Sequence, residues 1–459
     1  MSFEKLHAEM NEQIRDKELF ESSKGYAYAY LDQARTREVY PSRASLALLD
    51  RLSEPLPTGP GSPAEILSLL HEIGSRNTVA STGGRYFGFV TGGTVPVALA
   101  AKWLSDVWDQ SAALKIGSPI AAKLEDLCEH WMVELLGLPD NTVAGFVSGS
   151  SIAILCALAA ARNELLLRQG WDVAQKGLFG APPVRVVVGK QAHSSVAKAL
   201  SLLGFGKGNL DEVPVDDQGR IKPDALPRFD SNTLLILQAG NVNGGAFDPL
   251  DELCTRAQKA GAWVHIDGAF GLWAAACERT KHLTKGMEKA DSWSVDAHKT
   301  LNVPYDSGIV LCKNRSALVR ALQATGSYLP YGEGRDGMLY TPEMSRRARG
   351  VELWATLKYL GKSGIGELVD HLCEMTQYFA AELERNGFIV ENEVVFNQIL
   401  MRCAQPDATT RLLERIQASG KCWCGGALWK ERPVIRISVC SWQTTPQDID
   451  ECIELFTSL

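Results

Sequence analysis

The sequence lacks the features of a secreted, membrane-bound or nucleic-acid-binding protein. The polar start from Met1 to Lys17 has no signal-peptide hydrophobic region, and no run of 18 consecutive apolar residues occurs. Positive charge is not in excess, because 47 Lys and Arg face 54 Asp and Glu, for a net charge of −7. This balance argues against nucleic acid or an anionic membrane as a partner. With 459 residues, 45% of them hydrophobic, the chain can bury a large core, and we expect a cytoplasmic enzyme.

Cysteine spacing that would indicate disulfides or a metal site is also missing. The eleven cysteines are odd in number and scattered, which fits a reducing cytosol. The one close pair, Cys422-Trp423-Cys424, lacks the two-residue gap and the second ligand pair of a zinc site. An alternating strand is the better interpretation of that segment, and no metal is expected.

What is present is an apolar run that ends on a carboxylate, followed by a lysine at the end of a later strand. The run Ala262–Ile266 precedes Asp267, and Lys299 lies in the stretch 294–300. Pyridoxal phosphate requires an amine that bonds to its aldehyde and an acid that keeps its ring nitrogen protonated. Taken singly, Lys299 could equally be a solvated surface lysine and Asp267 a turn former or helix cap.

Two further segments add to this pattern. Gly149-Ser150-Ser151 precedes the helix-forming stretch 152–162, so free backbone N–H groups and two hydroxyls would form a phosphate cradle. An ordinary serine N-cap is the alternative. His193 follows the apolar run Val184–Val188, where its imidazole could stack on an aromatic ring or be a hydrogen-bonded core histidine.

In this order, the residues from about 86 to 362 resemble the group II pyridoxal-phosphate-dependent amino-acid decarboxylases. The motifs that carry the resemblance are Ser148-Gly149-Ser150-Ser151, His193 with Lys198-Ala199, Gly244-Gly245-Ala246-Phe247-Asp248-Pro249, His265-Ile266-Asp267-Gly268-Ala269, Ala297-His298-Lys299, and Ser345-Arg346-Arg347 before Trp354. The resemblance implies a fold-type I α/β enzyme that uses pyridoxal 5'-phosphate and acts as a homodimer.

The resemblance also assigns roles to individual residues. It makes Lys299 the lysine bonded to the cofactor, Asp267 the partner of the ring nitrogen, and His193 and Ala269 the residues on the two ring faces. Ser150, Ser151 and His298 would bind the phosphate.

A glycine-rich segment, 323–345, is expected to be a loop that carries a proton-donating tyrosine. Tyr340 is the first candidate and Tyr331 the second, and an exposed loop tyrosine is the alternative for both. Near the expected pocket, Phe87 and Phe89 favour an aromatic or bulky apolar substrate, whereas Arg85 could pair with the carboxylate of an acidic one.

Three departures from the family pattern leave the reaction open. Ile152 stands where many members have an acidic residue, and Gly240-Asn241-Val242-Asn243 replaces a usual Gly-Thr-Thr, with the loss of a hydroxyl. Asp296 takes a place where relatives often have Asn, beside the expected phosphate. Decarboxylation of an L-amino acid to the amine and carbon dioxide is the favoured function. A pyridoxal-phosphate lyase, aldehyde synthase or aminotransferase is the alternative, and an inactive homologue acting as a binding subunit is a third.

The chain is expected to divide into three parts. Residues 1–80 form a helical arm, with Leu6, Met10 and Ile14 at helical spacing. Residues 81–355 form the large cofactor-binding domain around a mostly parallel sheet, and 356–459 a small α+β domain. The expected strands are Val184–Val188, Leu234–Gln238, Trp263–Ile266, Trp293–Val295 and Ile309–Cys312. The last helix is expected to begin at Thr445-Pro446, with Asp448 at its third position.

Overall fold

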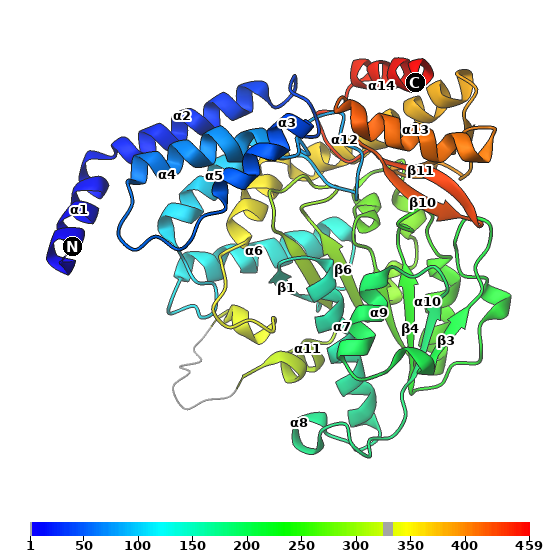
Figure 1. The fold of residues 1–459 in the computed structure, drawn as a ribbon. Coiled ribbons are helices and arrows are strands. Elements are labelled where there is room, and N and C mark those ends of the chain that lie inside the picture. The colour runs from blue at the N-terminus through cyan, green and yellow to red at the C-terminus, as the bar shows by residue number, and fades with distance from the viewer. Residues whose placement is uncertain (1, 325–333) are drawn as a thin grey trace.

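The computed structural model describes residues 2–324 and 334–459, apart from the side chain of Pro406. Figure 1 shows a helical arm at one end, a central sheet with helices on both faces, and a smaller sheet beside the C-terminal helices. The helices are α1 Phe3–Asp16, α2 Glu18–Gln33, α3 Arg43–Leu46, α4 Pro63–Leu69, α5 Pro96–Trp108, α6 Pro119–Leu136, α7 Ser150–Arg168, α8 Val173–Lys176, α9 Ser194–Leu202, α10 Leu250–Ala260, α11 Arg315–Leu322, α12 Gly350–Arg385, α13 Pro406–Ser419 and α14 Pro446–Ser458.

The central sheet is mostly parallel, as the sequence predicts. In the described part of the chain it has seven strands in the order β1-β7-β6-β5-β4-β2-β3. Only β7 runs against its neighbours, β6 and β1. The strands are β1 Val143–Val147, β2 Arg185–Gly189, β3 Leu210–Val213, β4 Thr233–Gln238, β5 Trp263–Asp267, β6 Ser292–Asp296 and β7 Gly308–Cys312. All five predicted strands are present, and β1 and β3 are additional.

Apolar side chains on the two faces of this sheet form two separate cores. Val186, Val188 and Ile236 pack with α7, α9 and α11 on one face. Val187 and Leu235 pack with α6, α10 and α12 on the other face. Because alternate residues of a strand point to opposite faces, an uninterrupted apolar strand is the sequence signature of a sheet covered on both sides. Helix α7 is long and apolar enough to cross a membrane, but 61% of its apolar window is buried, and it is the central helix of one core.

The first two helices of the arm bury none of their apolar side chains, although Val39 and Ile73 further along the arm are buried. Helices α1 and α2 have no buried residue, and Phe3 and Ile14 are 73% and 65% exposed. Figure 1 shows α1 extending away from the body of the molecule. The helical periodicity therefore marks a surface that this chain leaves uncovered.

The smaller sheet belongs to the C-terminal part. Its order is β10-β11-β9-β8, with β8 Ile389–Val390, β9 Gln398–Arg402, β10 Gly425–Trp429 and β11 Arg432–Ser438. The expected boundary at 355–356 falls inside α12, whose backbone departs from helical geometry at Gly361, where φ is +59°. Helix α14 begins with the predicted capping box between Thr445 and Asp448. The strand expected at Cys422-Trp423-Cys424 is not formed: these residues lie just before β10, and Trp423 makes only an isolated bridge with Tyr86.

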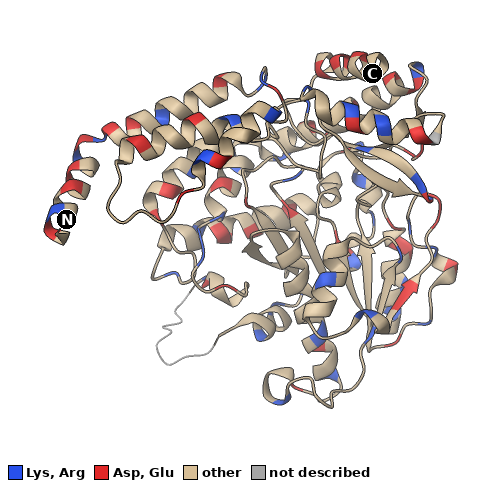
Figure 2. Cartoon of the chain, viewed as in Figure 1, with Lys and Arg blue, Asp and Glu red and all other residues tan. Residues whose placement is uncertain are grey.

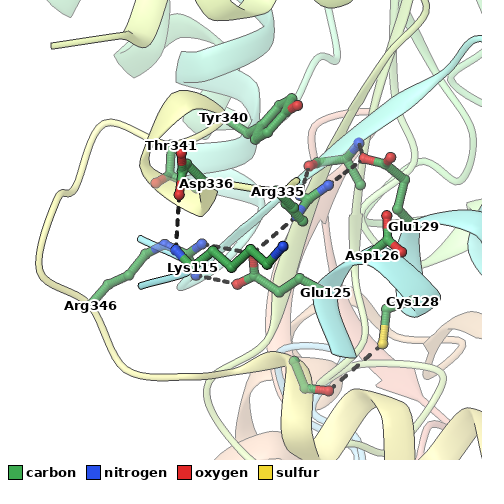
Figure 3. A network of polar contacts seen from close by, with 12 residues as sticks. Lys115, Glu125, Asp126, Cys128, Glu129, Arg335, Asp336, Tyr340, Thr341 and Arg346 are labelled. Carbon is green, nitrogen blue, oxygen red and sulfur yellow. Dashed lines mark hydrogen bonds and ion pairs between the residues drawn. The ribbon is translucent and has the colours of Figure 1, made fainter. Parts of the chain in front are cut away.

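Charged side chains of both signs are interspersed over the visible helices, as Figure 2 shows. One cluster of charged side chains is buried instead, and it connects α6 to the segment that precedes α12. Glu125, 1% exposed, accepts hydrogen bonds from both terminal nitrogens of Arg346, at 2.6 and 2.9 Å, and from Nε of Arg335 at 3.3 Å. Arg335 also donates to Glu129 and to the carbonyl oxygen of Ala144 in β1 (Figure 3).

We expect Glu125→Gln to lower the free energy of unfolding by roughly 3–5 kcal/mol, because two buried guanidinium groups would lose their shared carboxylate. Urea denaturation followed by fluorescence measures the change. The matched control is Glu134→Gln on the same helix, which removes an ion pair with Lys362 whose side chains are about two-thirds exposed. This control should cost less than about 1 kcal/mol. Equal losses in the two variants would contradict the assigned importance of the buried cluster.

Candidate active site

A pocket of about 600 Å³ opens at the carboxyl ends of the parallel strands. Ligands bind at this edge in open α/β sheets, because the loops after the strands converge there. The predicted residues Ser150, Ser151, His193, His298 and Lys299 line the pocket. The other lining residues are Phe89, Val90, Gly149, Gln191, Ala192, Ser194, Val242, Asn243, Asp296 and Arg436.

The backbone around Lys299 is held by a buried asparagine. The amide nitrogen of Asn302 donates to the carbonyl oxygens of Lys299, Thr300 and Cys440, at 3.3, 2.8 and 2.9 Å. Its amide oxygen accepts from the N–H groups of Gly93 and Trp442, at 2.7 and 3.0 Å. One side chain therefore ties two distant segments, at Gly93 and at Cys440 and Trp442, to the turn after the lysine.

Glycine is required where the first of these segments passes the lysine. A Cβ at Gly92 would lie 2.1 Å from the carbonyl oxygen of Lys299, which is far closer than atoms can approach. The absence of a side chain at residue 92 thus lets the two backbones meet.

Asp267 is the last residue of β5 and is 5% exposed. In the described residues, its carboxylate accepts hydrogen bonds from the N–H of Ala269 at 3.2 Å and the hydroxyl of Ser294 at 3.5 Å, and it has no ion-pair partner. Burial raises the pKa of Asp267, and the charges of His193 and Lys299 oppose that rise. A buried acid without a cationic partner is suited to a cationic group of a ligand.

His193 caps α9 and exposes one ring nitrogen. Its Nδ1 accepts a hydrogen bond from the N–H of Ser195 at 3.2 Å and lies 2.6 Å from the hydroxyl of Ser195. The neutral ring therefore carries its proton on Nε2. Burial lowers the pKa of His193, which favours this neutral form. His193 is therefore hydrogen-bonded, as expected of a core histidine, and it also lines the pocket.

Ser150 and Ser151 begin α7, whose N-cap, Gly149, has no capping side chain. The N–H of Ser150 donates to Oδ1 of Asp296 at 2.6 Å, and the positive end of the helix dipole at this point favours an anion. His298 is fixed beside it, because its Nδ1 accepts from the N–H of Ser307 at 3.1 Å and its ring stacks on Tyr305.

Two residues expected near the substrate lie elsewhere. Phe87 is fully buried and packs edge-on against Phe379 in the core of the small domain, so it cannot contact a substrate. Arg85 pairs with Glu451 at 2.9 Å, which removes it as a carboxylate ligand. Phe89 does line the pocket, next to Val90, and its ring contacts Trp423. No strand covers Phe87 or Phe89; the backbone turns at Phe89 and Val90, whose φ values are +52° and +56°, and this turn separates the two phenylalanines.

Tyr340, predicted as the proton donor, also requires a correction. It is 5% exposed, its hydroxyl accepts a hydrogen bond from Arg315 at 2.9 Å, and the guanidinium of Arg335 lies 4.5 Å from its ring (Figure 3). It belongs to the core formed with α7 and α11 and is not part of the pocket. Tyr331, the second candidate, lies outside the described residues.

Ala269 and Asn241, the remaining residues expected near the cofactor, make hydrogen bonds with the protein backbone around the pocket. Ala269 is partly buried, and its carbonyl oxygen accepts from the N–H of Asp296 at 2.8 Å. The amide oxygen of Asn241 accepts from the N–H groups of Asn243 and Gly244, so Asn241 shapes a turn and does not replace the missing hydroxyl.

Arg436 is the pocket residue that the sequence interpretation missed. It lies in β11, donates to the carbonyl oxygen of Val242 at 3.3 Å, and leaves its buried Nε without a partner. Burial lowers its pKa. The available signal was a single arginine inside the apolar run Val434-Ile435-Arg436-Ile437.

The donor set fits pyridoxal phosphate. A protonated ring nitrogen would supply the cation that Asp267 lacks among the described residues, and Lys299 is the pocket's amine. The hydroxyls of Ser150 and Ser151 at the start of α7 line the same pocket and suit a phosphate. The conserved domain of pyridoxal-dependent decarboxylases matches residues 65–403. The chain belongs to the pyridoxal-dependent decarboxylases. Its cofactor is therefore pyridoxal phosphate, and its reaction is a decarboxylation of an amino acid.

Known relatives differ in their substrates. The chain is 26% identical to an aromatic-L-amino-acid decarboxylase of Bacillus atrophaeus over 447 residues, which cover 92% of this chain and 90% of the relative. It is 30% identical to an aromatic-L-amino-acid decarboxylase of Drosophila lebanonensis, over 79% and 94% of the two chains. An acidic amino acid decarboxylase of Xenopus tropicalis is 27% identical over 72% of this chain and 66% of the relative.

Solved structures show the same fold. The structure of Oryza sativa TDC with PLP and tryptamine superposes with a TM-score of 0.88 at 22% identity, over 97% of both chains. A 4-hydroxyphenylacetaldehyde synthase of Rhodiola rosea superposes with a TM-score of 0.82 at 21% identity, over 100% of this chain and 98% of that one.

We expect Lys299→Ala to abolish covalent attachment of the cofactor, because Lys299 is the amine that lines the pocket. Borohydride reduction followed by peptide mass spectrometry locates the adduct in the wild type and detects its loss in the variant. Replacement of the exposed Lys198 by Ala is the control and should leave the adduct unchanged. An adduct of the same yield in Lys299→Ala would refute the assignment.

Asp267→Asn separates attachment from chemistry. The variant should still form the adduct but lose roughly 10²–10⁴ in rate, since its amide cannot hold a proton on the ring nitrogen.

Proposed function

We propose that this decarboxylase acts on L-amino acids with an aromatic or bulky side chain and releases the amine and carbon dioxide. The observation that carries the proposal is the position of Phe89, a 63% exposed ring on the pocket wall, backed by Trp423. The ring of Tyr86 also stacks on Trp423, with ring centroids 5.3 Å apart. An aromatic surface of this kind favours an apolar or aromatic partner.

The proposed roles follow from the positions of the side chains. When bound, pyridoxal phosphate supplies a cationic ring that takes up the electron pair left behind by the departing carboxylate. Lys299 would provide the amine, and Asp267 would hold a proton on the ring nitrogen. Ser150, Ser151 and His298 would surround the phosphate at the start of α7. Ala269 and His193 would lie on opposite faces of the ring.

His193 and Arg436 are the two pocket groups suited to a substrate carboxylate. The N–H at Nε2 of His193 can donate one hydrogen bond, and the unpartnered Nε of Arg436 can donate another. Both sit in a desolvated site, where hydrogen bonds to a charged group are strong. These residues would orient the α-carboxylate, so that one bond of the substrate is directed for cleavage.

A second candidate substrate class is the acidic amino acids. Arg436 would then bind the side-chain carboxylate, since its guanidinium is buried and incompletely paired. The similarity to an acidic amino acid decarboxylase supports this candidate.

A second candidate outcome is aldehyde formation, because the position of Tyr340 leaves it unable to protonate the product carbon, and one structural neighbour is an aldehyde synthase.

We also propose that the enzyme is a homodimer in the cytoplasm. The uncovered apolar side chains of α1, together with exposed Phe20 and Leu31 of α2, form a surface that a second copy would bury. An apolar groove of about 780 Å³ between α2, α4 and α5, with Trp103 in its wall, extends this surface. All eleven cysteines are free thiols, which suits a reducing compartment.

Deleting residues 2–33 should convert the dimer into a single chain, because it removes most of this apolar surface. Sedimentation velocity gives the mass of both proteins. A full-length protein that sediments as one chain would contradict the dimer, and a truncated protein that stays dimeric would contradict the role of the arm.

The substrate proposal is tested by incubating the purified holoenzyme with each of the twenty amino acids and measuring carbon dioxide, amine and aldehyde. We expect the highest kcat/KM for an aromatic amino acid. Arg436→Leu should lower kcat/KM for it by roughly 10–10²-fold, because one hydrogen bond to a charged group is lost.

Each product pattern decides between the candidates. Highest activity with aspartate or glutamate would establish the acidic class and overturn the aromatic proposal. Equal amounts of carbon dioxide and aldehyde, without amine, would identify an aldehyde synthase. No carbon dioxide from any amino acid would refute decarboxylation of these substrates.

A further inference from the structure

Asp296 places a buried carboxylate where the phosphate of the cofactor is expected. It ends β6 and is 1% exposed. Its Oδ1 accepts a hydrogen bond from the N–H of Ser150 at 2.6 Å, and its Oδ2 lies 3.2 Å from Nζ of Lys299 and 3.6 Å from Nε2 of His298. The single carboxylate thus contacts the helix start, the amine and the histidine that would otherwise serve the cofactor.

Residues 2–324 and 334–459 supply no other side-chain cap for this helix. Gly149 has no side chain, and the capping hydrogen bond comes from Asp296, which lies 146 residues further along the chain. The N-terminal end of a helix attracts one anion through its N–H groups and its dipole. The carboxylate of Asp296 already accepts a hydrogen bond from one of those N–H groups, that of Ser150.

A phosphate monoester brings about −1.5 to −2 charges at pH 7. Placed at the same helix end, it would be repelled by the carboxylate in a site with little water to screen the two charges. An asparagine in this position would keep the acceptor for Ser150 and remove the repulsion.

We propose that Asp296 is an internal competitor of the cofactor's phosphate, which weakens binding of pyridoxal phosphate and makes the cofactor readily exchangeable. The inference rests on pyridoxal phosphate being the cofactor. It makes Asp296 the residue that sets how much the phosphate contributes to affinity. The ion pair with Lys299 further stabilises the cofactor-free protein, since the amine and the carboxylate satisfy one another.

Asp296→Asn tests the proposal, with two ligands compared on each protein. Apoenzyme is titrated with pyridoxal phosphate and with pyridoxal, and Kd is read from the absorbance of the bound cofactor. Asp296→Asn binds pyridoxal phosphate at least ~10-fold more tightly, and its affinity for pyridoxal tightens by a smaller factor, because pyridoxal also takes Lys299 from the ion pair but has no phosphate. Inorganic phosphate likewise competes with pyridoxal phosphate at a lower concentration in the variant.

The control variant is Asp217→Asn, which removes the same charge from a side chain that is 87% exposed. It leaves both Kd values at those of the wild type. Thermal unfolding of apo Asp296→Asn checks that the amide still caps α7.

Three results would overturn the proposal. The first is an unchanged or weaker Kd of Asp296→Asn for pyridoxal phosphate. The second is a Kd for pyridoxal that falls as much as the Kd for pyridoxal phosphate, which would assign the effect to Lys299 alone. The third is a Kd change of the same size in Asp217→Asn, which would show that the effect comes from the net charge of the protein. In each case the wild type still binds cofactor and releases carbon dioxide, so these failures differ from a failure of the proposed function.

Discussion

The geometry of the active site depends on the buried amide of Asn302. Its five hydrogen bonds connect the turn after Lys299 with Gly93 near the arm and with Cys440 and Trp442 beyond the last strand. Buried polar groups stabilise a structure only when every donor and acceptor is satisfied, and here both atoms of the amide are fully used. The lysine is therefore positioned by the large domain, the segment after the arm and the small domain together.

The same pocket gathers charges that are individually costly to bury. Asp267, Asp296, Lys299 and Arg436 surround His193, and burial shifts the pKa of His193 and of Arg436 downwards and that of Asp267 upwards. Desolvation favours the neutral form of every such group. The opposite charges of Asp296 and Lys299 offset part of this cost, whereas Asp267 has no ion-pair partner among the described residues.

The sequence predicts the parts of this site that follow directly from a strand. Asp267, His193, Ser150 and Lys299 lie at or just after strand ends, so local patterns locate both the strand and the residue. The directions of Phe87 and Tyr340 depend on packing against Phe379 and Arg315, which are distant in the chain, and no local pattern contains that information.

Arg436 and Asn302 were missed for a related reason. Each acts across segments that only the folded chain brings together, one from β11 to Val242 and the other from the lysine turn to Trp442. The polar character of Arg436 within an apolar strand was visible, but its partner was not. The mostly parallel sheet was predictable, because an apolar strand covered on both faces needs only its own composition to be recognised.

The pocket has two kinds of wall, with different freedom to change. Ser150, His193 and Lys299 follow strands of the central sheet, whereas Phe89 and Arg436 come from segments outside it. A mutation in the outer segments leaves the strands and their cores intact. Evolution can therefore exchange the amino acid that the enzyme accepts and retain its cofactor chemistry, which suits a scaffold shared by relatives of different specificity.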